Sequence, residues 1–142
     1  MKRKLICFDQ LYPPGHVRDA LALDGSKCFY AQRLDILNNE NIAYDNVYIL
    51  ADYGSSLSPE ILIRIDFLEK WIEAGKIKFS YNTESIEAVK ADKTNSMILK
   101  VKRGVPLLRT YEVFFNKSNK PIVVFESFYR GDRIKLISNI KK

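Results

Sequence analysis

Asp9 and Asp52 each follow a short apolar run, at residues 5–8 and 47–51, and together they could support phosphoryl chemistry. If the two runs are parallel neighbouring strands, both carboxylates lie at the carboxyl edge of a sheet, where α/β proteins bind ligands. The turn at residues 53–56 contains glycine and serine and precedes a predicted helix, so it could hold a phosphate. This arrangement would suit Mg²⁺ and phosphoryl or nucleotidyl transfer, although no P-loop lysine or Asp-x-Asp pair accompanies it. One hypothesis is therefore a Mg²⁺-dependent enzyme with Asp9 and Asp52 as metal ligands.

The single histidine, His16, excludes several kinds of active site. Zinc sites built on paired histidines and two-histidine phosphoesterase sites cannot form with one imidazole. His16 follows Pro-Pro-Gly, which predicts a rigid turn and a solvated side chain. The two cysteines, Cys7 and Cys28, lie among apolar neighbours, so we expect buried, reduced thiols in place of a disulfide framework.

The positive charge of this 142-residue chain is concentrated in its second half. Residues 1–75 contain 8 Lys and Arg and 11 Asp and Glu, a net charge of −3, whereas residues 76–142 contain 15 and 6, a net charge of +9. A basic half is typical of a surface that faces phosphates, so nucleic acid is the expected partner. Its aromatic residues could stack on bases if they are exposed, or could form the core. The apolar runs are too short for a membrane span or a signal peptide, so we expect a cytoplasmic protein without a membrane partner.

The end of the chain predicts a basic β-hairpin. Residues 107–115 and 121–129 are typical of two strands, and the polar segment 116–120 is typical of the turn between them. The first strand carries Arg and Tyr, and the second ends in an aromatic and basic cluster. In this pattern, residues 97–137 resemble the C-terminal half of RelE/HigB-like ribonuclease toxins. The chain departs from that family in its long N-terminal half and in lacking a histidine or tyrosine after Arg133.

The resemblance implies a metal-independent endoribonuclease. Its arginines would stabilise the charge on the scissile phosphate, and a tyrosine or lysine would position or deprotonate the 2′-hydroxyl. The expected catalytic residues are Arg109, Tyr111, Arg130 and Arg133, and the expected nucleic-acid contacts are Lys100, Lys102, Arg103, Tyr129 and Lys135.

Local periodicity predicts the elements that would position these residues. Short apolar or alternating runs predict strands at residues 5–8, 47–51, 77–81, 97–102, 107–115, 121–129 and 134–137. Apolar spacing and capping residues predict helices at 17–23, 27–38 and 83–91, and a longer helix between Ser58 and Gly75. Ser58 as N-cap, Pro59 at the first helical position and Gly75 as the stop make the last of these the clearest helix.

Together these elements predict one α+β domain over residues 1–142, with helices and two early strands followed by a C-terminal antiparallel β-meander. The favoured function is binding of nucleic acid, RNA in preference to DNA, through the basic sheet; whether the domain also cleaves RNA stays open. A second hypothesis is a non-enzymatic binding or inhibitor module for an acidic protein surface or a nucleotide ligand. The acidic and basic faces could also pair between copies in an oligomer. Mg²⁺ is required only by the hypothesis based on Asp9 and Asp52, and the others need no cofactor.

Overall fold

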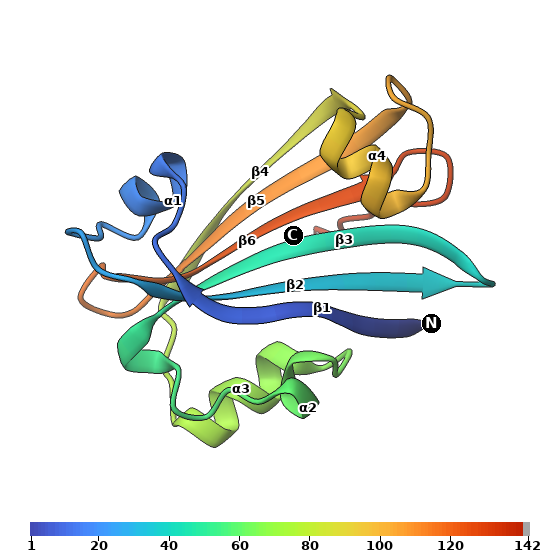
Figure 1. The fold of residues 1–142 in the computed structure, drawn as a ribbon. Coiled ribbons are helices and arrows are strands. Elements are labelled where there is room, and N and C mark those ends of the chain that lie inside the picture. Colours follow the sequence, from blue (N-terminus) through green and yellow to red (C-terminus); the bar gives the residue numbers. More distant parts are fainter. Residues whose placement is uncertain (141–142) are drawn as a thin grey trace.

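A single antiparallel sheet of six strands forms the centre of the computed structural model, which describes residues 1–140 (Figure 1). The strands are β1 Lys2–Leu11, β2 Cys28–Leu37, β3 Glu40–Leu50, β4 Tyr81–Lys90, β5 Pro106–Phe115 and β6 Pro121–Arg130. They lie in the order β1-β2-β3-β6-β5-β4, so strands from the two halves of the chain meet at the centre of the sheet. The helices are α1 Gly15–Ala20, α2 Pro59–Leu62, α3 Phe67–Gly75 and α4 Lys93–Leu99, with a 3₁₀ turn, η1, at Ala51–Tyr53.

Different helices cover the two faces of the sheet. Successive residues of a strand point to opposite faces, and Phe125 of β6 packs edge-on against Phe67 of α3 with 6.4 Å between ring centroids. The face that carries Phe125 is therefore named the α2/α3 face. On the opposite side α1 contacts β6 and α4 contacts β3, and this is the α1/α4 face. In Figure 1, α2 and α3 lie below the sheet and α1 and α4 above it.

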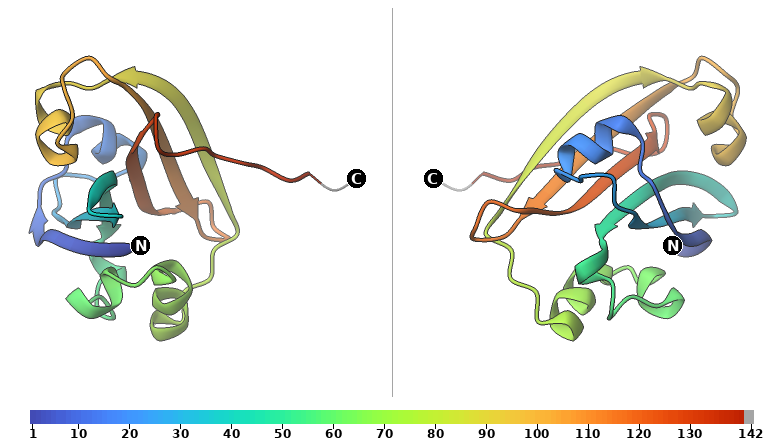
Figure 2. Two further views of the ribbon diagram at one scale, coloured as in Figure 1. Left: turned by 90° about the vertical axis from the view of Figure 1, so that its right-hand side faces the viewer. Right: turned by 60° about the vertical axis from the view of Figure 1, so that its left-hand side comes forward.

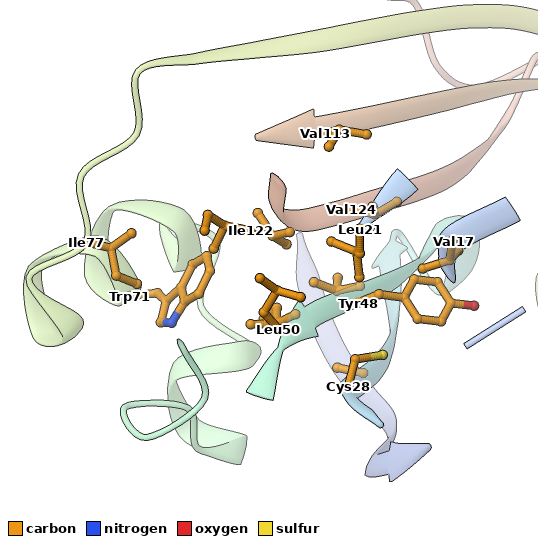
Figure 3. Close-up of a cluster of buried hydrophobic side chains, with 14 of the residues drawn as sticks. Val17, Leu21, Cys28, Tyr48, Leu50, Trp71, Ile77, Val113, Ile122 and Val124 are labelled. Carbon is orange, nitrogen blue, oxygen red and sulfur yellow. The ribbon is translucent and has the colours of Figure 1, made fainter. Parts of the chain in front are cut away.

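Trp71 anchors α3 in the hydrophobic core (Figure 3). Its side chain is fully buried and stacks on Phe67, with 5.7 Å between ring centroids. Its Nε1 donates a hydrogen bond to the Tyr53 carbonyl at 3.2 Å. The consecutive residues Ile122–Val124 of β6 are also fully buried, because helices cover both faces of this central strand.

The long helix predicted after Ser58 is interrupted between α2 and α3. Ser58 caps its start as predicted. Beyond that point, the carbonyl of Leu62 accepts a hydrogen bond from Arg33, and the carbonyl of Arg64 accepts one from Arg3. Both arginines come from the sheet, and their side chains bind backbone carbonyls at the break between α2 and α3.

The predicted fold class, helices and two early strands followed by a C-terminal meander, is wrong. The segments predicted as helices at 27–38 and 83–91 form β2 and β4, and the strand predicted at 97–102 lies at the end of α4 and in the following loop. β2 separates β1 from β3, so the two early strands do not form the predicted parallel pair. The segment 77–81 enters a strand only at Tyr81. The strand predicted at 134–137 is absent, and the end of the chain runs away from the sheet (Figure 2).

The C-terminal hairpin prediction is confirmed, since β5 pairs with β6 along the predicted strands. The apolar runs at 5–8 and 47–51 lie in β1 and in β3 with the start of η1, and α1 overlaps the helix predicted at 17–23. Cys28 is a buried free thiol as expected, whereas Cys7 is exposed because its side chain lies on the edge strand β1.

The β2–β3 connection explains the wrong helix prediction at 27–38. Asn38 and Asn39 have φ values of 51° and 62°, which match a two-residue type I′ hairpin turn. Because asparagine also ends helices, the pair is locally ambiguous. The apolar spacing from Tyr30 to Leu34 fits a helical turn, but these residues also share one face of a strand.

We expect Asn39→Val to destabilise the domain by about 1–2 kcal/mol, because a β-branched residue is disfavoured in the left-handed region. The measurement is urea-induced unfolding of the purified domain. Asn39→Gly is the matched control and should leave stability unchanged or raise it. Equal losses in the two variants would contradict the role assigned to the positive φ.

Candidate ligand-binding site

A cavity of about 230 Å³ lies between the α2/α3 face and the segment where α2 meets α3. Ile65, Phe67 and Leu68 contribute apolar side chains from the helical side. We name it the Arg33 cavity, after a lining residue that is only 4% exposed. The sheet contributes the polar residues Arg33, Asp45, Thr110, Glu112, Ser127 and Tyr129.

Strand register places four polar residues in one row across the sheet. Arg33 of β2 lies opposite Asp45 of β3, and Ser127 of β6 lies on the other side of Asp45. Thr110 of β5 completes the row opposite Ser127. Facing residues of neighbouring antiparallel strands point to the same side of the sheet, so the row presents one continuous polar surface to the cavity.

Arg33 links the sheet to α2. Its Nε donates to Asp45 Oδ1 at 2.9 Å, its Nη2 donates to Asp45 Oδ2, and its Nη1 donates to the Leu62 carbonyl at 3.1 Å. The guanidinium also lies 5.0 Å from the ring centroid of Phe67. Three of the five N–H groups of this buried guanidinium are therefore engaged, and the pair with Asp45 has the two-pronged geometry that arginine and carboxylate favour.

Arg3 makes the equivalent connection from the edge strand β1. Its Nε donates to Asp35 at 2.7 Å, and its Nη2 donates to the second oxygen of Asp35 at 3.2 Å. Its Nη1 donates to the Arg64 carbonyl at 3.0 Å. Two arginine–aspartate pairs therefore position the backbone that closes the cavity.

The far end of the cavity combines hydroxyl groups with carboxylates. Thr110 and Ser127 are 6% and 8% exposed. Burial raises the pKa of Tyr129, while the nearby hydroxyls of Ser127 and Thr110 oppose that rise. Burial and the negative charge of Glu84 raise the pKa of Glu112, and this rise is opposed by the Asn82 amide, whose Nδ2 donates to Glu112 Oε2 at 2.7 Å.

The structure places the expected catalytic residues Arg109 and Tyr111 on the opposite, α1/α4 face. Arg109 is engaged by two carboxylates, Glu126 at 2.6 Å and Glu87 at 3.0 Å. The Tyr111 hydroxyl donates to the His16 carbonyl at 3.4 Å. His16 lies on α1, and its Nε2 is 3.4 Å from the Glu126 carboxylate. These contacts join α1 to the sheet.

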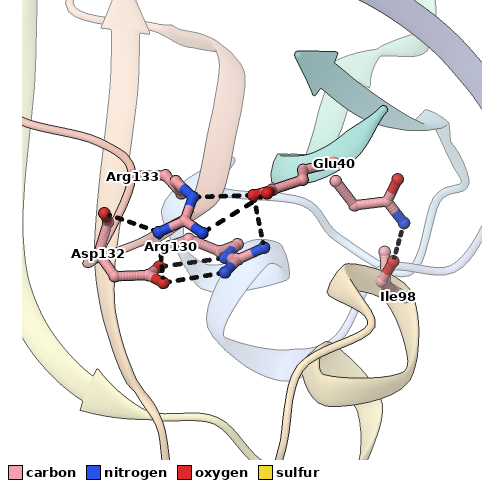
Figure 4. Close-up of polar contacts among 6 residues, drawn as sticks. Glu40, Ile98, Arg130, Asp132 and Arg133 are labelled. Atoms are coloured by element: carbon pink, nitrogen blue, oxygen red, sulfur yellow. Dashed lines mark hydrogen bonds and ion pairs between the residues drawn. The ribbon is translucent and has the colours of Figure 1, made fainter. Parts of the chain in front are cut away.

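Arg130 and Arg133 form a separate ion cluster at the end of β6 (Figure 4). Both contact Glu40, at 3.3 and 2.8 Å, and both contact Asp132, at 2.9 and 3.0 Å. Their charges are therefore balanced within the domain. The expected nucleic-acid contacts are scattered: Lys100, Lys102 and Arg103 are exposed after α4, Lys135 is exposed beyond β6, and Tyr129 lines the Arg33 cavity.

Asp9 and Asp52 are not on neighbouring strands. Asp9 lies in β1 and Asp52 in η1 after β3, and β2 runs between β1 and β3. Asp9 Oδ1 accepts a hydrogen bond from the backbone N–H of Gln10 at 2.7 Å. No group of three or more His, Cys, Asp or Glu residues that could hold a metal ion occurs in residues 1–140.

A family model described as the UTRA domain matches residues 1–135. The chain belongs to the UTRA domain family. This UTRA domain is similar in fold to the possible transcriptional regulator YydK from Bacillus subtilis, with a TM-score of 0.88 and 16% identity. That match covers 99% of this chain and 61% of YydK, so the chain spans less than two thirds of that relative. No curated protein sequence matches this chain.

Two further structures resemble this UTRA domain along nearly their whole length. One is a GntR-family transcriptional regulator from Enterococcus faecalis, with a TM-score of 0.86 and 17% identity over 97% of this chain and 99% of that one. The other is the effector-binding domain of the trehalose repressor TreR from B. subtilis, with a TM-score of 0.85 and 14% identity over 100% of this chain and 99% of that one. At these identities the likeness establishes the fold.

The family membership corrects the function expected from the sequence. The resemblance to RelE/HigB-like toxins is wrong, because the UTRA domain model matches residues 1–135 and the similar structures include a GntR-family transcriptional regulator. The predicted RNA binding and endoribonuclease activity are overturned with it. No helix within residues 1–140 is long and apolar enough to cross a membrane.

Of the residues singled out from the sequence, Tyr129 lines the cavity of this UTRA domain. Arg33, Asp45, Thr110 and Ser127 were missed. They come from four strands, and their common feature, a polar residue on the inward face of a strand, becomes visible only when the strand register is known.

Proposed function

We propose that this UTRA domain is the effector-binding domain of a GntR-family transcription regulator and binds a small molecule, without catalysis, in the Arg33 cavity. The polar row across β2, β3, β6 and β5 carries the proposal, because it combines buried hydrogen-bonding groups with an apolar wall in one concave site. The effector-binding domain of TreR and other GntR-family structures share the fold, which supports the assignment. The sequence-based hypothesis of a non-enzymatic binding module agrees with it.

The contacts of Arg33 and Arg3 suggest how an occupied cavity could change the domain. Both guanidiniums hold the carbonyls of the α2–α3 segment, at Leu62 and Arg64. A ligand that displaces or reinforces these contacts would bind with different affinities to conformations in which the contacts are formed or broken, and such a difference shifts a conformational equilibrium. In the proposed regulator, the shift acts on a separate DNA-binding domain, so nucleic acid is an indirect partner.

A cytoplasmic location follows from this role. Association between copies through oppositely charged faces and binding to an acidic protein stay predictions.

The test is a thermal-shift screen of the purified domain against a library of small metabolites, followed by calorimetry on the hits. We expect Thr110→Trp to abolish binding of these hits, because the indole would fill a cavity of about 230 Å³. Ser85→Trp is the matched control, because Ser85 is exposed on the α1/α4 face opposite Tyr111 and should leave affinity unchanged.

A second variant tests the same site with a smaller change, in case Thr110→Trp does not fold. Ser127→Ala removes one hydroxyl and should weaken binding by about 2- to 10-fold, the usual net worth of a hydrogen bond of 0.5–1.5 kcal/mol. Circular dichroism confirms that each variant is folded. Hits that bind the Thr110→Trp and Ser127→Ala variants as tightly as the wild type would place the ligand elsewhere and contradict the proposal.

A further inference from the structure

We infer that the Arg33 cavity selects a hydroxylated organic cation, such as a polyol that carries a primary amine, and rejects phosphorylated and carboxylated ligands. The inference rests on the proposed function and names the class of its ligand. It excludes the nucleotide ligand considered from the sequence. Four features of the cavity support it: the pairing of its arginines, its balance of charge, two glutamates at facing positions, and a wall of hydroxyl and aromatic groups.

Both arginines of the cavity are already paired with a carboxylate and a backbone carbonyl. Three of the five N–H groups of Arg33 are engaged, two by Asp45 and one by the Leu62 carbonyl. Three N–H groups of Arg3 are engaged in the same way, two by Asp35 and one by the Arg64 carbonyl. A phosphate would have to compete with paired, partly buried carboxylates for these groups, and would leave an aspartate uncompensated.

Negative charge exceeds positive charge in the cavity wall. Two guanidiniums, of Arg3 and Arg33, stand against three carboxylates, of Asp45, Glu84 and Glu112. Since both guanidiniums are neutralised by aspartates, the remaining field in the cavity is that of the two glutamates. Such a field attracts a cation and repels an anion.

The two glutamates lie directly opposite each other. Glu84 of β4 is the register partner of Glu112 of β5. Like charges at such positions destabilise a sheet, and the Asn82 amide, which donates to Glu112, carries no charge to balance them. An ammonium group between the glutamates would remove this repulsion and form charge-assisted hydrogen bonds with both carboxylates.

The remaining wall favours a hydroxylated skeleton of modest size. The buried hydroxyls of Thr110 and Ser127 line the cavity beside the phenol of Tyr129, and each can donate or accept a hydrogen bond. Phe114 and Phe125 supply the apolar surface next to them. A ligand with hydroxyl groups along an aliphatic frame satisfies both kinds of surface.

The test uses matched trios of hydroxylated fragments that share one skeleton and carry an ammonium, a hydroxyl or a carboxylate group at the same position. Affinities are measured by calorimetry on the wild-type domain, and binding in the cavity is defined by its loss in Thr110→Trp. We expect the ammonium member of a trio to bind at least 10-fold more tightly than the carboxylate member. We also expect Glu112→Gln to reduce this preference about 10-fold while changing the affinity of the uncharged member less than 2-fold.

Glu73→Gln is the control, because it removes the same charge from the exposed side of α3 and should leave the preference intact. Tighter cavity binding of carboxylate members, or an ammonium preference that survives in Glu112→Gln and Glu84→Gln, would overturn the inference but not the proposed function. If no fragment or library compound binds in a way that Thr110→Trp abolishes, the proposed function itself fails, and the inference falls with it.

Discussion

Replacing Arg33 with alanine is expected to destabilise the domain by about 3–5 kcal/mol, the usual cost of breaking a buried ion pair. Arg33 is 4% exposed, and its removal would leave the Asp45 carboxylate without its partner in a half-buried site. The Leu62 carbonyl would lose its donor at the same time. The measurement is the free energy of unfolding in urea, together with the melting temperature of the variant.

A double variant separates the charge from the shape of this residue. Arg33→Met combined with Asp45→Leu removes both charges and keeps apolar volume, so it should recover most of the stability lost in Arg33→Ala. It should still fail to bind a ligand that needs the polar row. If Arg33→Ala loses less than 1 kcal/mol, or if the double variant is no more stable than the single one, the buried pair does not have the role assigned to it.

Local sequence pattern was sufficient for elements whose partners lie nearby in the chain. The β5–β6 hairpin was predicted from two apolar strands and a polar turn, and the Ser58 cap was predicted from its side chain alone. The capping box of Asp92 and Asn95 at the start of α4 was an equally local pattern that could have been found. It was missed because the following residues alternate in polarity as a strand does.

The central pairing of the sheet could not be predicted in this way. β3 pairs with β6, so Tyr44 stacks on Phe128, with 5.1 Å between ring centroids, although the residues are far apart in the sequence. The same pairing places Asp45 beside Ser127 and so creates the Arg33 cavity. Periodicity reports which face of an element is buried, but not which strand lies beside it. The cavity could therefore be recognised only once the order of the strands in the sheet was known.

Composition showed an excess of positive charge in the second half of the chain, but it could not show that several of these basic residues form ion pairs within the domain. Arg109, Arg130 and Arg133 are each paired with carboxylates, and Glu40, from the first half of the chain, binds two of them. The acidic and basic halves therefore neutralise each other partly within one sheet. The aromatic residues of this half, for which the sequence allowed either base stacking or a place in the core, include Phe114 and Phe125, which pack against each other.

Trp71→Ala is expected to cost about 3–5 kcal/mol of stability, as large-to-small changes of buried aromatic residues do. The indole is fully buried, stacks on Phe67, and lies 5.9 Å from the ring centroid of Phe79. Its loss would leave a cavity between α3 and the sheet and leave the Tyr53 carbonyl without its donor. Chemical unfolding monitored by circular dichroism measures the effect, since the variant loses its own tryptophan fluorescence.

Trp71→Phe divides this effect into its two parts. Phenylalanine keeps much of the aromatic packing but cannot donate to Tyr53, so the loss should be smaller than for alanine but should still include the value of the hydrogen bond, about 1 kcal/mol. Ile137→Ala is the surface control, because Ile137 is 74% exposed and its truncation should change stability by no more than about 0.5 kcal/mol.

The same variants test whether the core anchor shapes the cavity. Since α3 forms one wall of the Arg33 cavity through Phe67, Trp71→Ala should also weaken ligand binding, whereas Ile137→Ala should not. Unchanged ligand affinity in a folded Trp71→Ala domain would show that α3 does not need its core anchor to shape the cavity.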